Sequence, residues 1–525
     1  MNRILLIAAT ALAIVAAACG GGGGTSSTPP PPTGGFSNAS LKGSYAFSMS
    51  GQDGTTGAFL ARVGSFIADG NGNITAALED VNIGGTARQA VSFTGTYSIQ
   101  ANGKGTLTLN GALGGGLQLS IALNSANQGV MTQTDLAATS SGSFTLQSPA
   151  AFSNPGIAGG YVFDVSGGAT SNGAPVSVIG QAVTDGNGNV TGGVFDSNDG
   201  NSTTGPSGPQ TLPASTYAVD ATTNGTTFGR GTMTLAGLTF AFYIVDGTHI
   251  KLLEEDTVAN TLGDALKQPG GIPTTTAAWN AGNFVYAIGG AAVLGTGGPV
   301  SRAGRFTTSG SGTLSTVALN DNDNGTVRAT TTLSSATYAI DTTAGIAGSG
   351  RGTLTFTDSN LGTFSYVFYL VSPTQAVIQD ISNGIIGDGT LLAQSGTISA
   401  SSLAGNYVFN WSGVVLPSSG NVGFEEDFVG QYAQASSASL SGAVDFVELG
   451  STSTHTPLFS NSAVSGTFTL NGDGSGSNDY QVTISPTGAP ANTFHFKAYV
   501  AAGNVVFLVG ADNNQILGGN ASPQP

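Results

Sequence analysis

Residues 117–124 read Leu-Gln-Leu-Ser-Ile-Ala-Leu-Asn, and this alternation of apolar and polar side chains decides the fold class. Successive side chains of a β-strand point to opposite faces of its sheet, so a period of two predicts a strand with one buried and one solvated face. Residues 494–499, Phe-His-Phe-Lys-Ala-Tyr, have the same period. No segment longer than the N-terminal apolar run has a convincing apolar period of 3.6 residues. We therefore expect an all-β protein.

This strand pattern belongs to a unit that occurs four times. Each copy opens with a glycine two residues before an aromatic side chain, at Gly43, Gly159, Gly282 and Gly405. An Asp-Gly-Asn-Gly-Asn turn recurs at 69–73 and 185–189, a Gly-basic-Gly turn recurs at 103–105, 229–231 and 350–352, and three copies close on Gln147, Gln268 and Gln394. The fourth copy shows no Asp-Gly-Asn-Gly element, no basic residue and no closing glutamine. We interpret it as the diverged terminal copy.

Each copy is long enough to form a whole domain. The repeat predicts four β-units at 38–148, 156–269, 279–395 and 401–520, joined by short linkers. Each unit reads as about eight strands separated by turn residues. Eight antiparallel strands joined by short hairpins form a meander, which can close into an up-and-down β-barrel without free edges. An immunoglobulin-like β-sandwich is the alternative.

The opening motif and the repeat resemble known groups of proteins. Gly-x-Tyr resembles the Gly-x-Trp with which lipocalin-like and avidin-like barrels begin, with Tyr or Phe in place of Trp. The repeat as a whole is similar to the Gly-rich, lipid-anchored repeat proteins of Acidobacteria; this chain has 82 glycines in 525 residues. The resemblance implies a barrel fold and a lipid anchor.

Composition excludes several classes of function. Charged residues make up only 8% of the chain and hydrophobic residues 39%, which favours extracytoplasmic β structure over a disordered tail. The formal net charge is −16 and there is no basic run, so the chain should repel nucleic acid. We expect no nucleic-acid partner.

The N-terminus predicts export and lipidation. Residues 1–3 contain Arg3, and residues 4–18 are apolar but span only about 22 Å as a helix, short of a ~30 Å bilayer core. Ala-Ala-Ala-Cys-Gly at 16–20 resembles the bacterial lipobox. The resemblance implies a signal peptide at 1–18, removed before a lipidated Cys19, and an anchor in the membrane. Residues 19–37 form a Gly/Pro-rich tether.

The anchor also bears on location and on covalent chemistry. Gly20 follows Cys19 where retained lipoproteins carry Asp, so by analogy the protein moves to the outer membrane, with the side left open. Cys19 is the only cysteine, so the folded part has no disulfide and no thiolate zinc site.

Two turns resemble the start of a calcium loop. The spacing Asp-x-Asn-x-Asn begins each one, and an aspartate follows at the twelfth position. Ile74 and Val190 stand where such a loop needs glycine, so a hairpin turn is the alternative reading. The candidates for a weak cation site are Asp69, Asn71, Asp80, Asp185, Asn187 and Asp196.

The turns of a meander alternate between the two ends of the barrel. The Asp-Gly-Asn-Gly turn and the Gly-basic-Gly turn therefore lie at the same end. We expect Asp69 to face Lys104 and Asp185 to face Arg230. The alternative is that each basic residue only solvates its own tight turn.

Little in the sequence points to catalysis. The dense carboxylate runs, Glu254-Glu255-Asp256 and Glu425-Glu426-Asp427, predict solvated acidic edges more than a glycosidase pair. The three histidines have no ordered nucleophile and acid for a triad, and no phosphate loop or Rossmann fingerprint occurs. We expect no catalytic residues, no resident metal and no cofactor.

These observations favour a lipid-anchored envelope or surface protein with a non-enzymatic display or binding role. Its partner would be a protein, a glycan or another cell. The alternative is a carrier of small apolar ligands inside its barrels, which a cavity of several hundred cubic ångströms would favour. An envelope hydrolase is a third reading.

Replacing Cys19 by serine should abolish acylation and release the protein from membranes, because a serine hydroxyl cannot form the thioether to the lipid. Metabolic labelling with a fatty acid and fractionation of the cell measure both effects. Membrane retention of the variant without any acyl label would refute the lipobox.

Overall fold

The computed structural model describes residues 35–525 except 112–115, 136, 203–204, 280–281, 295–296, 331–332, 383, 395, 397, 418–422, 450–457 and 472–476. The described residues are mostly antiparallel strands. Their helices are α1 (Thr223–Phe228) and the 3-10 turns η1 (Asn38–Ser40), η2 (Pro149–Ala151), η3 (Asn154–Ile157) and η4 (Ala502–Asn504). The all-β prediction is confirmed. The signal peptide, Cys19 and most of the tether lie outside the described residues.

The first and fourth sheets are closed barrels of consecutive strands. The first contains β1 (Lys42–Asp53), β2 (Phe59–Asp69), β3 (Asn73–Ile83), β4 (Thr86–Ile99), β5 (Lys104–Asn110), β6 (Leu117–Ser125), β7 (Gln128–Gln133) and β8 (Ala138–Leu146). The fourth contains β27 (Gly405–Val415), β28 (Phe424–Gln434), β29 (Ser439–Leu449), β30 (Leu458–Thr469), β31 (Asn478–Ser485), β32 (Asn492–Val500), β33 (Val506–Gly510) and β34 (Gln515–Pro523). In both barrels the last strand pairs with the first.

The two middle sheets have nine strands because their fourth strand is split. The second contains β9 (Gly159–Ala169), β10 (Pro175–Thr184), β11 (Asn189–Asp199), β12 (Ser207–Leu212), β13 (Ser215–Val219), β14 (Arg230–Leu235), β15 (Leu238–Asp246), β16 (His249–Glu254) and β17 (Ala259–Lys267). The third contains β18 (Asn283–Ala292), β19 (Gly298–Thr308), β20 (Leu314–Asp323), β21 (Thr326–Ala329), β22 (Leu333–Ile340), β23 (Arg351–Asp358), β24 (Gly362–Ser372), β25 (Gln375–Asp380) and β26 (Ile385–Gln394). The second closes through the β10–β11 pairing, whereas in the third β20 and β22 meet only at the Thr313–Thr337 bridge.

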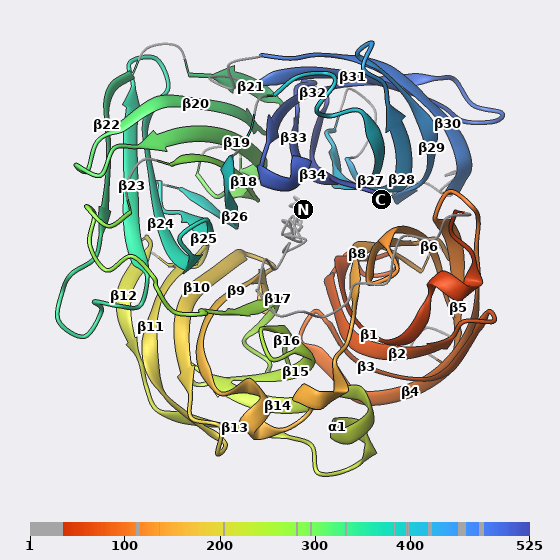
Figure 1. The fold of residues 1–525 in the computed structure, drawn as a ribbon, viewed down its shortest axis with the longest axis horizontal. Coiled ribbons are helices and arrows are strands. Elements are labelled where there is room, and N and C mark those ends of the chain that lie inside the picture. The colour runs from red at the N-terminus through yellow and green to blue at the C-terminus, as the bar shows by residue number, and fades with distance from the viewer. Residues whose placement is uncertain are drawn as a thin grey trace, which may run out of the picture.

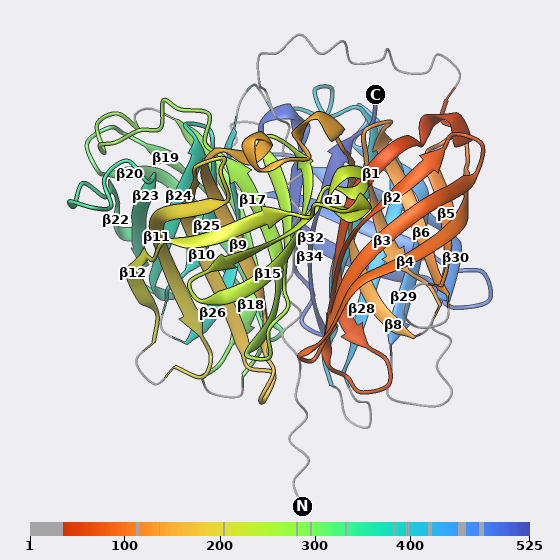
Figure 2. The ribbon, with the colours of Figure 1, turned by 90° about the horizontal axis from the view of Figure 1, so that it is seen from below.

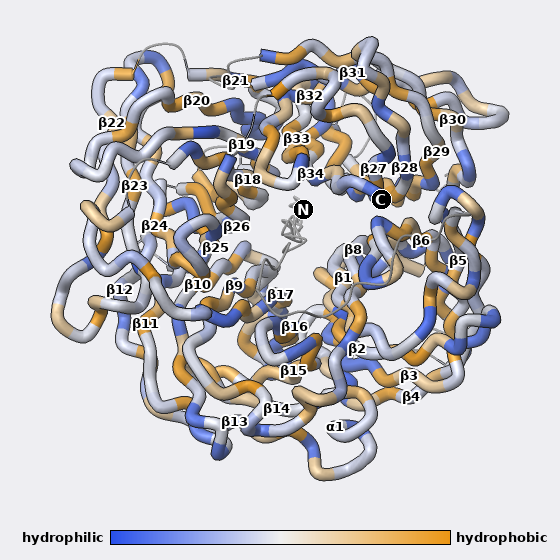
Figure 3. Tube along the Cα trace, viewed as in Figure 1, coloured by the Kyte–Doolittle hydropathy of each residue, from blue (hydrophilic) through white to orange (hydrophobic). Residues whose placement is uncertain are grey.

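The meander prediction is confirmed, and the sandwich alternative is wrong, because consecutive strands pair within one sheet. Side chains alternate between the inside and the outside of each unit, as a period of two requires. In the first barrel Tyr45, Phe47 and Met49 of β1 point inward and pack with Leu119 and Phe144. Each unit has such a core of its own, and hydrophobic positions alternate with hydrophilic ones along the strands (Figure 3).

One glycine of the second strand recurs because an aromatic ring lies against it. A Cβ added to Gly64 would come within 2.6 Å of the Phe47 ring, and one added to Gly430 within 2.6 Å of the Phe409 ring. Such distances are shorter than van der Waals contact, so a larger residue would displace the ring from the core. Gly180 beneath Phe163 and Gly304 beneath Tyr286 repeat the arrangement in the middle units.

The four units stand side by side around a common axis, and the first lies next to the fourth (Figures 1 and 2). Each of three interfaces between consecutive units contains an apolar cluster. Among the described strands, pairing occurs only within a unit, so the ring is held by side chains. The ring buries two sides of the outer surface of every barrel, and polar groups there need partners.

A buried carboxylate receives an arginine and a tyrosine from the next unit at two interfaces. Arg230 donates to both oxygens of Asp80 (Nε to Oδ2 2.9 Å, Nη2 to Oδ1 2.7 Å), and Tyr243 Oη donates to Oδ2 at 2.6 Å. At the second–third interface, Asp196 takes the place of Asp80. Arg351 and Tyr369 are its donors there.

The remaining two interfaces keep parts of this contact. Tyr499 Oη donates to Asn320 Oδ1 at 2.8 Å between the third and fourth units. Lys104 Nζ donates to Asp445 Oδ1 at 2.9 Å between the first and fourth units, and both side chains are buried. The contact therefore recurs around a closed ring, although the fourth unit supplies no basic residue.

The closing glutamines also join each unit to the next one around the ring. Gln147 Nε2 donates to the carbonyls of Phe228 and Ile244 in the next unit, at 2.9 and 2.6 Å. Gln524 donates to the equivalent carbonyls of the first unit, Asn102 at 3.1 Å and Leu123 at 2.7 Å. The prediction that the fourth copy lacks a closing glutamine is wrong. The residue was overlooked because β34 runs to Pro523, past the predicted end of the unit.

Replacing Arg230 by methionine should lower the free energy of unfolding by about 3–5 kcal/mol, because Asp80 then keeps a buried charge without a cation. Adding Asp80→Asn should recover part of this loss. Lys497→Met, which breaks an exposed pair with Asp479, should change stability by no more than about 1 kcal/mol. Urea titrations measure all three, and an unchanged midpoint for Arg230→Met would contradict this account of the interface.

Candidate functional site

The two Asp-Gly-Asn-Gly turns are closed by their own aspartates. Asp69 Oδ1 accepts from the backbone N–H groups of Asn71 (2.7 Å) and Asn73 (3.0 Å), and Oδ2 accepts from Asn73 Nδ2 (2.7 Å). These hydrogen bonds lower the pKa of Asp69 to about 2. Asp185 makes the same three contacts with Asn187 and Asn189. Each carboxylate thus stabilises a tight turn.

The structure does not bring the six cation-site candidates together. Asp80 lies within β3 opposite Val63, six residues along β2 from Asp69, and its carboxylate binds Arg230. Asp196 binds Arg351 in the same way. In the described part of the chain, no group of three or more His, Cys, Asp and Glu side chains is placed to hold a metal ion.

The expected pairing of turn residues is wrong. Lys104 binds Asp445 of the fourth unit and not Asp69, and Arg230 binds Asp80 of the first unit and not Asp185. In a free barrel the basic side chain at this turn would have only its own unit to bind. In the ring it reaches across an interface to a neighbouring unit. Burial explains the choice, because an unpaired buried carboxylate needs the cation more than an exposed turn does.

The expectation of solvated acidic edges is also wrong. Glu254 points into the second barrel, fully buried, and accepts a hydrogen bond from Thr261 Oγ1 at 2.6 Å. Its burial raises its pKa to about 8. Glu425, Glu426 and Asp427 are all buried as well. A strand that is in a barrel and at an interface is buried on both faces, and an alternating pattern does not reveal this.

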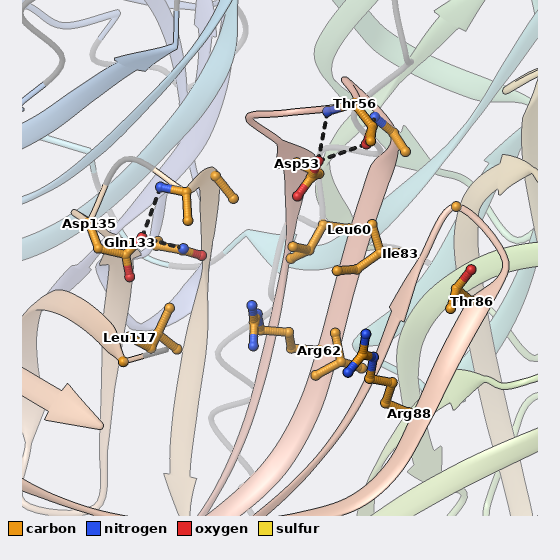
Figure 4. Close-up of a pocket in the computed structure, with 16 residues that line it drawn as sticks. Asp53, Thr56, Leu60, Arg62, Ile83, Thr86, Arg88, Leu117, Gln133 and Asp135 are labelled. Carbon is orange, nitrogen blue, oxygen red and sulfur yellow. Dashed lines mark hydrogen bonds between the residues drawn. The ribbon is translucent and has the colours of Figure 1, made fainter. Parts of the chain in front are cut away.

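The open end of the first barrel contains a cavity of about 550 Å³ (Figure 4). It lies between the β1–β2, β3–β4 and β7–β8 hairpins, at the end opposite the Asp69 turn. Its apolar wall includes Leu60, Val81, Ile83 and Leu117. The aromatic core fills the other end of this barrel.

Two arginines reach this cavity from β2 and β4, the strands on either side of β3 (Figure 4). Arg62 is buried and pairs through Nη1 with Glu79 Oε2 at 3.2 Å. Arg88 is exposed and lies across the β3–β4 ladder from Val81. Within the described part of the chain, Arg88 forms no ion pair and no hydrogen bond. Its guanidinium is therefore available to a ligand.

The acids at the rim of the cavity hold turns. Asp53 accepts from the N–H groups of Thr55 and Thr56 at 3.1 and 2.8 Å. Asp135 accepts from the N–H of Gln118 at 2.9 Å and from Gln133 Nε2 at 2.8 Å. These carboxylates are held by their turns and form no ion pair with Arg88, although each still places a negative charge at the rim.

The third unit carries two arginines at the same places. In each unit, one residue of the first strand lies six residues after the opening glycine. Arg62 and Arg302 each pair with that residue from the second strand of their own unit. Arg328 lies across the ladder from Asp321, as Arg88 lies across from Val81. Arg302 pairs with Asp321 and Asp380, and Arg328 pairs with Asp321 and Asp323. Three carboxylates thus neutralise two guanidinium groups in this unit.

The first unit lacks all three of these aspartates. The strand registers place Val81, Ile83 and Gln133 at the positions of Asp321, Asp323 and Asp380, respectively. Both arginines are therefore paired with acids in the third unit, whereas in the first unit Arg62 pairs with Glu79 and Arg88 stays exposed. Sequence reasoning missed this site, although Arg-x-Gly at 62–64 and at 302–304 is a repeated signal.

Comparisons with known proteins leave the function to be argued from this geometry. No family model matches the sequence, and no curated protein matches it. Among solved structures, the isotype 1 transferrin-binding protein B from serogroup B Neisseria meningitidis is 11% identical, covers 76% of this chain and 84% of its own, and has a TM-score of 0.19. Intact Ap-TbpB, with N and C lobes, is 8% identical, covers 92% and 96%, and has a TM-score of 0.18. Scores this low establish no common fold.

The described residues contain no helix that is both long and apolar enough to cross a membrane.

Glu254→Gln should remove one pH dependence of stability. The folded protein holds this proton up to about pH 8, whereas the unfolded chain releases it near pH 4.5. Wild-type stability therefore falls between these values, by about 1 kcal/mol per pH unit, and levels off above pH 8. Urea unfolding should show equal stabilities at pH 4 and a more stable variant at pH 8. If the free energy of unfolding changed with pH in the same way for both proteins, a buried, protonated Glu254 would be contradicted.

Proposed function

We propose that this protein is a lipid-anchored envelope protein that binds a small amphipathic anion in the open end of its first barrel. The observation that carries the proposal is the pair Arg62 and Arg88 in a cavity from which the three neutralising aspartates of the third unit are missing. The role we propose is binding; in the described lining the Thr56 hydroxyl donates to Asp53 at 2.7 Å, and this contact closes the β1–β2 turn.

The size and walls of the cavity fit a small organic ligand. Small-molecule sites have volumes of about 300–1,000 Å³ and apolar walls with a few polar groups. Leu60, Ile83 and Leu117 supply the apolar wall. A ligand with a short hydrocarbon body would bury its apolar surface against these side chains.

The unpaired donors of Arg88 favour an anionic head group. The Glu79 carboxylate compensates Arg62 at the bottom, and Asp53 and Asp135 accept from their own turns, so Arg88 is the charged group whose donors remain for a ligand. A guanidinium group presents parallel N–H donors that match the two oxygens of a carboxylate or the oxygens of a phosphate. The ligand head group would therefore sit at the mouth, beside Arg88, with its body inside.

The remaining units support this barrel. The cavity opens at the end of the first barrel opposite to the one where the chain enters, since Phe36 N donates to the Ala101 carbonyl near the β4–β5 turn. The first described residues therefore join the barrel at the end away from the mouth. The ring of four units gives the cavity a rigid frame.

Titration of the protein with octanoate tests the proposal. Binding is measured by the displacement of the fluorescent anion anilinonaphthalene sulfonate from the protein. Arg88→Met should weaken octanoate binding about tenfold or more, because one charged hydrogen-bonding group is lost. Val81→Asp should weaken it similarly, because it installs the acid of the third unit. Octan-1-ol, which has no charge, should bind the wild type and Arg88→Met alike. Octanoate binding that is absent in the wild type or unchanged in both variants would contradict the proposal.

A further inference from the structure

The interface between the first and fourth units differs in chemistry from the other three. Each of those three contains an apolar cluster. The first–second cluster includes Phe59 and Leu262, the second–third cluster Ile179 and Val367, and the third–fourth cluster Val285 and Phe507. The first–fourth cluster contains only Ala122, Val408 and Val429, with Val130 against it. Small apolar contacts leave the rest of this interface to polar side chains.

Two of these polar side chains are carboxylates on one face of β28. Glu425 and Asp427 alternate with inward residues and point away from the fourth barrel, toward the first. The registers put them at the positions that Phe59 and Ala61 occupy in β2. The first–second interface is thus apolar where the first–fourth interface is acidic.

The facing strand of the first unit carries hydroxyl groups. Thr139, Ser141 and Ser143 alternate along the outer face of β8, where β17 of the second unit has Asn260, Leu262 and Asp264. The Thr139 and Ser141 hydroxyls lie close enough to lower the pKa of Glu425 and Asp427, respectively, against the larger rise that burial causes. Acids and hydroxyls therefore face each other across the interface.

Neither carboxylate has a cation among the described residues. Glu425 is 4% exposed and Asp427 is 1% exposed. Lys104, which also lies at this interface, is engaged with Asp445. Two buried carboxylates in this position are unfavourable as long as nothing neutralises them.

Several oxygens at this interface make no hydrogen bond to any described residue. They are Glu425 Oε2, Asp427 Oδ1, Asp427 Oδ2, Thr139 Oγ1 and Ser143 Oγ. All belong to residues that are more than nine-tenths buried. A buried polar atom without a partner points to a bound group that satisfies it.

We infer that a hard cation such as Ca²⁺ binds between Glu425 and Asp427 of β28 and the hydroxyl groups of β8. Calcium takes six to eight oxygen ligands, and the unpartnered atoms of Glu425, Asp427, Thr139 and Ser143 are all oxygens. Two carboxylates would balance its charge. The ion would join the first unit to the last and so close the ring, in place of the apolar cluster that the other interfaces have.

Calcium titration of the full chain by calorimetry, after treatment with EDTA, tests this inference. We expect one site in the millimolar or submillimolar range that is typical of extracellular modules, and a higher thermal unfolding midpoint with calcium than in EDTA. The double variant Glu425→Gln/Asp427→Asn keeps both shapes without charge. Its calcium affinity should fall at least 100-fold, and it should be no less stable than the wild type in EDTA.

Asp69→Asn is the matched control, because it removes an exposed turn carboxylate and should leave calcium binding unchanged. Loss of binding in Asp69→Asn alone would place the ion in the turn and overturn the inference. So would a wild type without calcium response, or an equal response in the double variant. Octanoate binding measured in EDTA keeps the outcome for the ligand cavity separate.

Discussion

A carboxylate that is buried between two barrels must meet a positive charge or a strong donor, and the next unit around the ring supplies it. Asp80 receives Arg230, and Asp196 receives Arg351, each with a tyrosine hydroxyl. The chain has only 13 lysines and arginines, yet these interfaces use several of them. A barrel alone would leave each carboxylate in water, so the residues make sense only in the ring.

The side chains at a barrel end, and not the interfaces, decide whether that end can bind a ligand. The interfaces bury outer faces of the strands and leave the barrel ends open. In the third unit, Asp321, Asp323 and Asp380 occupy the open end and neutralise its arginines. Where these acids are absent, in the first unit, a cavity and the charge of Arg88 remain. Divergence between copies of one repeat thus neutralises the arginines in one unit and leaves Arg88 unpaired in another.

Much of the fold follows from local patterns in the sequence. Period-two alternation, the opening glycines and the turn motifs predict all-β meander units in four copies, because these signals depend only on neighbouring residues. The interfaces were not predictable in this way. Glu425 and Asp427 look like a solvated edge, and Lys104 looks like a turn residue, until the fourth unit is placed beside the first. The cavity arginines could have been found by aligning the copies, since Arg62 matches Arg302.

The closed ring is the central claim, because both the buried ion pairs and the polar first–fourth interface depend on it. Small-angle X-ray scattering from residues 35–525 tests closure most directly. The account predicts a distance distribution that matches the closed arrangement of Figure 1. A broader distribution with a longer maximum dimension, as four units in an open row would give, would contradict it.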